Sequence, residues 1–354
     1  MIGIVGGGVA AAKVVEGYRD AGGEEEMVLV SADSYPPYHR PPLSKRLLRG
    51  EAEPENALVH PAEWYAENGV ELRLDSRVGS LDELGADRVV LATGSRPRKL
   101  DSALVLRTLD DALELRRRGR EASTATVIGG GFIGCEVTAS LTQLGVRVTH
   151  VVREPHVFSA LQAPPLSEAL HDLYRERGVD LRLGSTDAPP ADLTVAGIGV
   201  EPNVELARDA GLDVRRGVVV DERFATSRPG VYAVGDIAEF YDPLYRRHRR
   251  IEHWSTATYQ GTQLGRILAG DEEARYDTVS AFFSEVFGYG LRLFGDPAGH
   301  ETLGVEGDFR AGKAIGRYRR DGRTIAAVTT GQDDEAHAAL QDEIRAGVSA
   351  AADG

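Results

Sequence analysis

The chain has 354 residues, which is long for one ordinary domain and suits two or three. Apolar residues make up 42% and charged residues 27%, enough for a globular core, and the net charge of −14 argues against general nucleic-acid binding. Cys135 is the only cysteine, which excludes a disulfide framework, a cysteine-based zinc cluster and a redox-active dithiol, and we expect no metal site.

No apolar run approaches the roughly 18 residues of a membrane span. A strand predicted from Ile2 leaves no room for a secretory leader. We therefore expect a soluble, cytoplasmic protein without membrane association.

Strand-like apolar runs alternate with helix-like segments along most of the chain, as in a doubly wound parallel sheet. Strands are expected at residues 2–5, 27–31, 88–92, 126–128, 147–152, 193–198 and 231–234. Helices are expected after two glycine loops and at about residues 61–67, 109–117, 165–177 and 255–268.

Residues 278–331 differ, because apolar and polar positions alternate there around an Asp321-Gly322 turn, which predicts antiparallel strands. After Gln332 we expect a helix that frays into the terminal AAADG. The predicted fold is α/β, with two doubly wound, Rossmann-like dinucleotide-binding domains and a C-terminal α+β domain. The expected domains are residues 1–105 with 221–275, residues 106–220, and residues 276–354.

A glycine fingerprint occurs twice, as IGIVGGGVAA from residue 2 and as ATVIGGGFIGCE from residue 125. Such glycines allow a tight turn, close approach of the backbone to a pyrophosphate and close packing of helix on strand. The fingerprint positions are Gly6, Gly8 and Ala11 in the first copy and Gly129, Gly131 and Gly134 in the second. Two copies indicate two dinucleotides, and hence hydride passing from one to the other.

Asp33 ends the strand that follows the first glycine loop and its helix. An acid at this distance from the glycines is placed to accept hydrogen bonds from a ribose. The alternative is that Asp33 only caps the next turn.

Three further segments occur in a characteristic order: YPPYHRPPLSK at 35–45, VVLATGSRPR at 89–98 and GVYAVGD at 230–236. Together with the glycine loops they resemble the flavoprotein pyridine-nucleotide reductases, in the branch of ferredoxin and rubredoxin reductases that serves oxygenases. The resemblance implies FAD on the first fingerprint, a nicotinamide dinucleotide on the second, and contact of Asp236 with the ribityl chain of FAD. It also implies cofactor contacts by Arg40, Ala92, Thr93, Gly94, Arg98, Ile133, Gly199 and Gly235.

Lys45 resembles the family lysine beside the reactive edge of the flavin, and Glu136 resembles its ion-pair partner. A lysine there stabilises the negative charge that the flavin gains on reduction, and the carboxylate holds the lysine in place. The alternative for each is a solvated surface charge. Trp254, in EHWSTATYQG, resembles an aromatic neighbour of the flavin, although a lone tryptophan before a helix is more often core.

The strand that ends at Val152 lacks the acid that NADH-dependent relatives usually carry there, and Arg153 follows it. An arginine beside a missing acid suits a 2′-phosphate, with His156 as a second ligand, so we expect NADPH. Glu154 is the alternative, as a ribose acceptor that would favour NADH.

Relatives that reduce disulfides or peroxides carry a cysteine close to the flavin, where this chain has PPLSK. The predicted function is therefore an NAD(P)H:ferredoxin or rubredoxin reductase: hydride passes to flavin N5, and single electrons pass on to an iron–sulfur carrier. Two alternatives remain, an oxidase or diaphorase that reduces oxygen or quinone, and a redox-sensing interaction module. The resemblance leaves a homodimer open.

The run RRHRR offers a docking site for a small acidic ferredoxin or rubredoxin at Arg246, Arg247, Arg249 and Arg250. A solvated hairpin paired with local acids is an equal alternative. The chain is also shorter than most relatives, because the segments before Ala92 and before Gly199 leave little room for the meander that each nucleotide domain usually carries.

Overall fold

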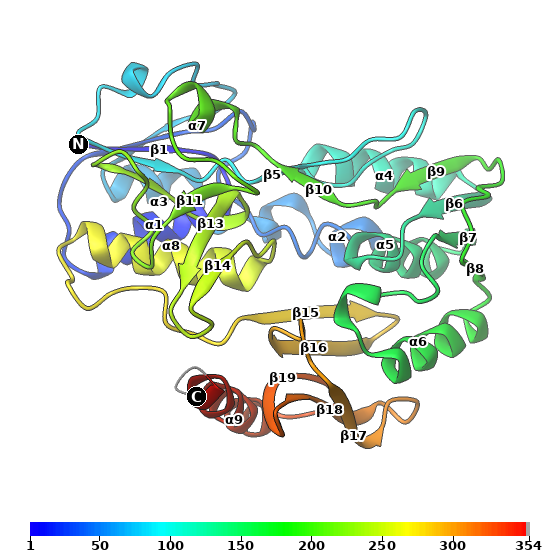
Figure 1. Ribbon diagram of the computed structural model, residues 1–354. Coiled ribbons are helices and arrows are strands. Elements are labelled where there is room, and N and C mark those ends of the chain that lie inside the picture. Colours follow the sequence, from blue (N-terminus) through cyan, green and yellow to red (C-terminus); the bar gives the residue numbers. More distant parts are fainter. Residues whose placement is uncertain (352–354) are drawn as a thin grey trace. The chain divides into compact units, whose positions relative to one another are not determined.

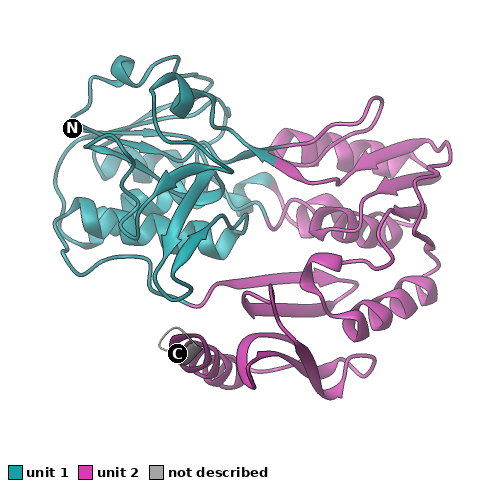
Figure 2. Cartoon of the chain, viewed as in Figure 1, with its two compact units in different colours: residues 1–40, 54–96, 201–278 teal, residues 41–53, 97–200, 279–354 magenta. Residues whose placement is uncertain are grey.

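The computed structural model describes residues 1–351 and divides the chain into two compact units. Unit 1 consists of residues 1–40, 54–96 and 201–278, and unit 2 of residues 41–53, 97–200 and 279–354 (Figure 2). The division into three domains stays a prediction. Among residues 1–351, no helix combines the length and the apolar character needed to cross a bilayer.

Unit 1 is built on a five-stranded parallel sheet in the order β12-β4-β1-β2-β3 (Figure 1). Its strands are β1 (Ile2–Val5), β2 (Met27–Val30), β3 (Val70–Arg73), β4 (Arg88–Leu91) and β12 (Val231–Ala233). Ile4 lies between Leu29 and Val90 in register, and all three side chains are fully buried. Such continuous apolar runs are typical of parallel strands covered on both faces. The strand order reverses between β1 and β4, which is where open α/β sheets bind ligands.

The helices of unit 1 are α1 (Val9–Asp20), α3 (Ala62–Glu67), α7 (Glu205–Asp209) and α8 (Trp254–Leu268). Short 3-10 helices occur at Pro54–Ala57, Leu81–Leu84 and Gly235–Ile237. A second sheet has the order β11-β13-β14, formed by Val218–Val220, Ala238–Asp242 and Arg247–Arg249. The strands β5 (Ser95–Pro97) and β10 (Val200–Pro202) pair with each other, at the places where the chain passes from one unit to the other.

Helices α1 and α8 approach each other at backbone distance because small residues line their contact. A Cβ on Gly261 would lie 2.4 Å from the carbonyl oxygen of Ala10, and one on Gly265 would lie 2.4 Å from that of Val14. On the other helix, a Cβ on Gly17 would lie 2.4 Å from the carbonyl oxygen of Thr262. Helix α8 therefore fixes α1, and with it the N-terminus of α1 at the first glycine loop.

Unit 2 contains a four-stranded parallel sheet in the order β8-β7-β6-β9. Its strands are β6 (Thr124–Ile128), β7 (Arg147–Val152), β8 (Asp180–Leu183) and β9 (Leu193–Ala196). The helices are α2 (Arg46–Arg49), α4 (Leu109–Glu121), α5 (Phe132–Gln143) and α6 (Pro164–Glu176), with a 3-10 turn at Ser159–Leu161. Helix α4 begins with a capping box, in which Thr108 and Asp111 each accept a hydrogen bond from the other's backbone N–H.

The rest of unit 2 is an antiparallel sheet in the order β15-β16-β19-β18-β17, packed against α9 (Asp334–Ala351) (Figure 1). The strands are β15 (Ala281–Val286), β16 (Tyr289–Gly295), β17 (Thr302–Asp308), β18 (Lys313–Arg320) and β19 (Arg323–Thr330). Asp321 and Gly322 both have positive φ, as a type I′ hairpin turn requires.

Every predicted strand and helix forms, with ends that shift by a few residues. Two segments were expected to leave little room for a meander. Within the described chain, β3 and β4 are joined by a 3-10 helix and β8 and β9 by a coil, with no further strand between them. That these segments are shorter than in most relatives stays a prediction. The AAADG tail begins as helix, and residues 352–354 lie outside the described residues.

Candidate functional site

The first glycine loop forms a close-packed turn at the reversal point of the unit 1 sheet. Gly6 has a φ of 125°, and a Cβ there would lie 2.1 Å from the carbonyl oxygen of Ala92 at the end of β4. Gly8 is the N-cap of α1, and a Cβ on it would lie 3.0 Å from a guanidinium nitrogen of Arg40. Ala11 is fully buried in α1. The helix N-terminus and the nearby guanidinium suit a pyrophosphate.

Asp33 and Asp236 are both held by hydroxyl groups. The Tyr38 hydroxyl donates to the Asp33 carboxylate at 2.7 Å, and the Ser95 hydroxyl donates to the Asp236 carboxylate at 2.7 Å. A carboxylate can accept several hydrogen bonds, so each of these side chains can accept from ribose or ribityl hydroxyls as well. Sequence reasoning missed Ser95, because its partner Asp236 lies 141 residues away in the chain and the two meet only in the folded protein.

The loop at Gly235 offers the clearest test of whether a cofactor fits. Gly235 has a φ of 79°, and its N–H donates to Gln260 Oε1 at 2.8 Å. Gln260 is fully buried, and its Nε2 has no hydrogen-bond partner among residues 1–351. The Thr256 hydroxyl, one turn earlier in α8, is also buried without one. Unpaired buried donors are costly, so these two fit a bound group such as FAD.

Thr93 and Gly94 are fixed by an asparagine that sequence reasoning did not single out. Asn203 donates its side-chain amide to the Thr93 carbonyl at 2.8 Å, and the Thr93 hydroxyl donates to the Asn203 carbonyl at 2.8 Å. The Asn203 N–H donates to the Gly94 carbonyl at 2.9 Å. This loop follows β4 and is therefore held next to the Gly6 turn.

Trp254 is the first residue of α8, and its indole N–H donates to Nδ1 of His39 at 2.9 Å. Burial lowers the pKa of His39, which keeps the imidazole neutral and able to accept this bond. The predicted contact of Trp254 with a flavin stays a prediction.

The second glycine loop repeats this geometry in unit 2. Gly129 has a φ of 115°, and a Cβ there would lie 2.3 Å from the carbonyl oxygen of Gly197, just after β9. A Cβ on Gly134 would lie 1.9 Å from the carbonyl oxygen of Gly129. Gly131, the N-cap of α5, would meet nothing within 4 Å, which leaves open space where a pyrophosphate would approach.

A buried histidine supports the second loop. His150 lies on β7, is fully buried, and donates Nε2–H to the Gly129 carbonyl at 2.9 Å. Burial lowers its pKa to about 4. The ring is therefore neutral at pH 7, and it braces the turn without adding charge.

Arg153, the predicted phosphate ligand, donates to Glu154, the alternative ribose acceptor, at 2.9 Å. This ion pair holds the pKa of Glu154 below its usual range. His156 stacks on His171, with ring centroids 5.5 Å apart. Of the other predicted residues, Ile133 is exposed on α5, and the Arg98 N–H donates to the Gly199 carbonyl at 2.9 Å.

Lys45 and Glu136 form an ion pair inside unit 2, with Lys45 Nζ 2.6 Å from Glu136 Oε2. Lys45 lies at the start of α2, and its ammonium also donates to the Pro41 carbonyl at 3.3 Å. Glu136 lies on α5 and is 4% exposed. The alternative of two solvated surface charges is wrong, because both side chains are largely buried.

Cys135, the neighbour of Glu136, is fully buried, and burial raises the pKa of its thiol. It is a core residue, as predicted, and a thiol in this protonated state is not a nucleophile.

The run RRHRR divides into buried and exposed members. Arg249 is 7% exposed and donates to the fully buried Asp242 at 2.7 Å, across the β13–β14 hairpin. Arg250 pairs with Glu252 and donates to the Asp236 carbonyl at 3.3 Å. Arg246 and Arg247 are exposed. A surface for a partner can therefore include the last two, whereas Arg249 stabilises the hairpin.

The family model for pyridine nucleotide-disulphide oxidoreductases matches residues 2–187 and 185–261. The chain belongs to this family. Putidaredoxin reductase CamA of Pseudomonas putida is 35% identical over 375 residues, covering 94% of this chain and 89% of the relative. The ferredoxin–NAD(+) reductase component of the anthranilate 1,2-dioxygenase system of Burkholderia cepacia is 33% identical, covering 93% and 91%.

Among solved structures, the covalent putidaredoxin reductase–putidaredoxin complex matches this oxidoreductase with a TM-score of 0.91 and 34% identity, covering 97% of this chain and 93% of that one. The predicted family, α/β fold and enzyme class are confirmed, and the protein is an FAD-dependent oxidoreductase that uses a pyridine nucleotide. The 375 aligned positions exceed the 354 residues of the chain, so the relative has segments that this chain lacks.

Proposed function

We propose that this oxidoreductase passes electrons from NADH to a small iron–sulfur carrier protein of the ferredoxin or rubredoxin class. The names of the putidaredoxin reductase and ferredoxin–NAD(+) reductase relatives support this proposal. The observation that carries it is the Lys45–Glu136 ion pair on the same chain as the two glycine loops, each of which we call a cradle for one dinucleotide.

The first cradle would hold FAD. Its pyrophosphate would lie at the N-terminus of α1, beside Gly6, Gly8 and Arg40, and Asp33 would bind the adenosine ribose. Asp236 would accept from the ribityl chain while the Ser95 hydroxyl holds its carboxylate. When bound, FAD accepts two electrons from a reduced nicotinamide and releases them one at a time.

The second cradle would hold the nicotinamide dinucleotide at Gly131, and we propose NADH in place of the NADPH that the sequence favoured. The relative from the anthranilate dioxygenase system carries NAD(+) in its name, and Arg153 is paired with Glu154. The Glu154 carboxylate neutralises the positive charge of Arg153, which a 2′-phosphate would need for binding. The second carboxylate oxygen of Glu154 can accept a hydrogen bond from the ribose.

Lys45 would place its ammonium at the reactive edge of the flavin, where it offsets the negative charge gained on reduction. Glu136 fixes the ammonium by the 2.6 Å ion pair. Cys135, the only cysteine, is buried with a raised pKa and would not take the electrons. A protein carrier that accepts single electrons is the acceptor we therefore favour over a disulfide or a peroxide.

The test is an anaerobic titration of the purified flavoprotein with NADH and, separately, NADPH, followed by addition of an oxidised ferredoxin. We expect NADH to bleach the flavin absorbance rapidly and the ferredoxin to restore it. Fast reoxidation by air without any effect of a carrier protein would favour the oxidase or diaphorase alternative. Failure of both nucleotides to bleach the flavin would contradict the reductase and favour the interaction module.

Two variants separate the nucleotide alternatives. Glu154→Ala should raise KM for NADH about tenfold, the order expected for loss of a hydrogen bond to a charged group, and leave kcat unchanged. Arg153→Ala is the matched control on the same loop and should leave KM for NADH unchanged. The reverse pattern, with Arg153→Ala weakening NADPH specifically, would return the choice to NADPH.

A further inference from the structure

Besides Lys45, the carboxylate of Glu136 has two hydroxyl partners, one on each of its oxygens. The Ser44 hydroxyl donates to Oε2 at 2.5 Å, and the Ser284 hydroxyl donates to Oε1 at 2.6 Å. Ser44 and Ser284 are 1% and 2% exposed. Among the described residues, Ser284 is the only side chain that donates to Oε1, so this hydroxyl decides which way that oxygen points.

Ser44 belongs to the segment that carries Lys45, whereas Ser284 comes from β15, 148 positions from Glu136 in the sequence. The Ser44 carbonyl in turn accepts from Ser140 of α5 at 2.6 Å. The loop before α2 is therefore tied to α5 independently of β15. Within residues 1–351, only Ser284 connects the antiparallel sheet to the carboxylate by a side-chain hydrogen bond.

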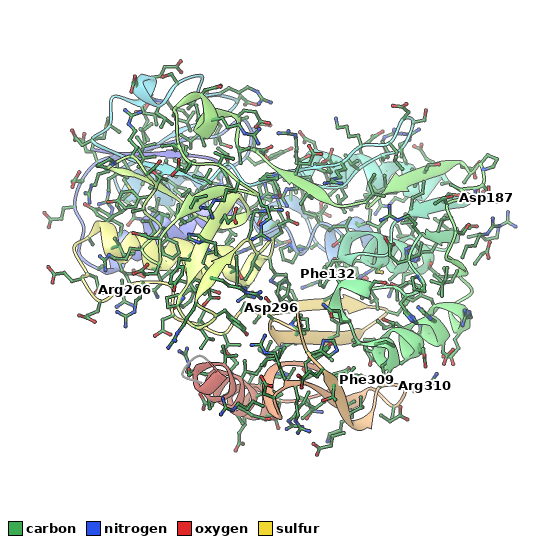
Figure 3. All side chains as sticks on the ribbon, in the orientation of Figure 1. Phe132, Asp187, Arg266, Asp296, Phe309 and Arg310 are labelled. Carbon is green, nitrogen blue, oxygen red and sulfur yellow. The ribbon has the colours of Figure 1, made fainter. Side chains whose placement is uncertain are left out.

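Strand β15 is aligned with α5 by two contacts of matching spacing. Phe282 stacks on Phe132, with ring centroids 6.2 Å apart and planes 10° apart, and Ser284 reaches Glu136. Residues two apart on a strand are about 6.6 Å apart and point to the same face. Residues four apart on a helix are about 6 Å apart on one face. The two pairs therefore hold strand and helix in one register (Figure 1; Phe132 is labelled in Figure 3).

We propose that Ser284 is a positioning residue for the reduction step: through its hydrogen bond to Oε1 it fixes the Glu136 carboxylate, and the carboxylate fixes the Lys45 ammonium. This inference rests on the proposed function, because it needs Lys45 to act where the flavin is reduced. Without the hydroxyl, the carboxylate can rotate about its last torsion, and the ammonium loses the single position that the ion pair defines.

The first experiment measures anaerobic flavin reduction by NADH in rapid mixing, on the flavin-loaded protein. Ser284→Ala should lower the limiting rate constant about tenfold, the order for loss of one hydrogen bond to a charged group. The dissociation constant for NADH should not change, since among the described residues the Ser284 hydroxyl bonds to Glu136 and to no residue of the loop from Gly129 to Gly134. Ser284→Thr, which keeps the hydroxyl, should restore most of the rate.

Ser280→Ala is the matched control. Ser280 is 1% exposed, lies four residues before Ser284, and donates to the Gly295 carbonyl at 3.2 Å. Its loss should leave the limiting rate constant at the parental value. Equal slowing in Ser280→Ala and Ser284→Ala would overturn the proposal, because any disturbance of the sheet would then have the same effect.

Lys45→Ala separates the failure of this inference from the failure of the proposed function. If Lys45→Ala is slow and Ser284→Ala is not, the positioning role is wrong and the function stands. If the flavin of Lys45→Ala is reduced at the parental rate, Lys45 is not at the site of reduction. Both the positioning role of Ser284 and the proposed function are then contradicted. If both act through the ammonium, the double variant should be no slower than Lys45→Ala alone.

A second readout does not depend on activity. Thermal unfolding of the same proteins should show that Ser284→Ala lowers the midpoint by about 2–4 °C when Glu136 is present. In a Glu136→Met background, Ser284→Ala should not lower the midpoint, because it removes a buried hydroxyl that has already lost its acceptor. An equal shift in both backgrounds would contradict the hydrogen bond on which the inference depends.

Discussion

At the scale of single residues, two glycines of the second glycine loop have different roles: Gly134 is needed for packing, whereas Gly131 leaves space for the cofactor. A Cβ on Gly134 would lie 1.9 Å from a backbone oxygen, whereas one on Gly131 would enter open space. The first loop has Ala11 at the position that corresponds to Gly134, so there α1 has room for a methyl group. The two fingerprints therefore differ in how closely helix and turn are packed.

Two single substitutions test this distinction. Gly134→Ala should lower the unfolding temperature by several degrees, because backbone must move to accommodate the methyl group. Gly131→Ala should leave that temperature nearly unchanged and raise KM for NADH, since its methyl group would occupy the space of the pyrophosphate. Thermal unfolding and steady-state kinetics of both variants would check this, and equal loss of stability would contradict it.

His150 predicts a dependence of stability on pH. Its pKa is about 4 when folded, below the ordinary value of 6.5. Between these values the unfolded chain binds a proton that the native chain does not, so stability falls as the pH drops from about 6.5 to about 4, by roughly 3 kcal/mol in total. His150→Gln should flatten this acid loss, measured as denaturant midpoints at pH 7.5 and 5.

The matched control for that experiment is His248→Gln, because His248 is partly exposed on β14. It should retain the parental acid loss. Part of the slope should remain even in His150→Gln, since burial and the neighbouring His156 also lower the pKa of His171 to about 4. If His150→Gln loses as much stability between pH 7.5 and pH 5 as the parental protein, the His150 ring is not buried in the neutral form.

At the scale of elements, the contact between α1 and α8 positions the first cradle. Gly261 and Gly265 are spaced by one helical turn and let α8 lie against the backbone of α1. A methyl group on either would force the helices apart, and α1 carries the N-terminus at which we place the FAD pyrophosphate.

We therefore expect Gly265→Ala to lower the amount of FAD retained on purification and to lower the unfolding temperature. Gln263→Ala is the matched control, because Gln263 lies between the two glycines in sequence and on another face of α8. It should retain FAD as the parental protein does. Full retention in Gly265→Ala would mean that the α1–α8 contact does not position the cradle.

The elements also show what the sequence could and could not predict. The glycine loops and Asp33 follow strand ends, so local pattern was sufficient to single them out, and Asp236 was singled out by the family resemblance of its segment. Ser284 and Gln260 act on residues far away in sequence, and no local pattern marks a serine in a strand or a glutamine in a helix as functional. Arg249 looked like one charge in a surface run, but hairpin pairing places it beside Asp242 in the core.

At the scale of the whole molecule, an acidic protein with net charge −14 has to meet a carrier that we expect to be acidic as well. Overall repulsion slows such an encounter, and a local basic patch has to compensate for it. Arg246 and Arg247 are exposed at the β13–β14 hairpin, and we propose them as part of the docking surface. Arg249 is buried and Arg250 is only partly exposed, so both would contribute less.

The double variant Arg246→Glu/Arg247→Glu tests this surface without disturbing the buried Arg249–Asp242 pair. It changes the net charge from −14 to −18. We expect KM for an acidic ferredoxin to rise about tenfold at low salt. This rise in KM should shrink at high salt, because screening removes charge steering.

The control variant, Arg117→Glu/Arg118→Glu on α4, makes the same change in net charge at another exposed site and should raise KM for ferredoxin less. Reduction of ferricyanide by NADH should stay parental in both variants. Equal effects of the two would mean that only total charge matters, whereas loss of ferricyanide reduction would indicate misfolding.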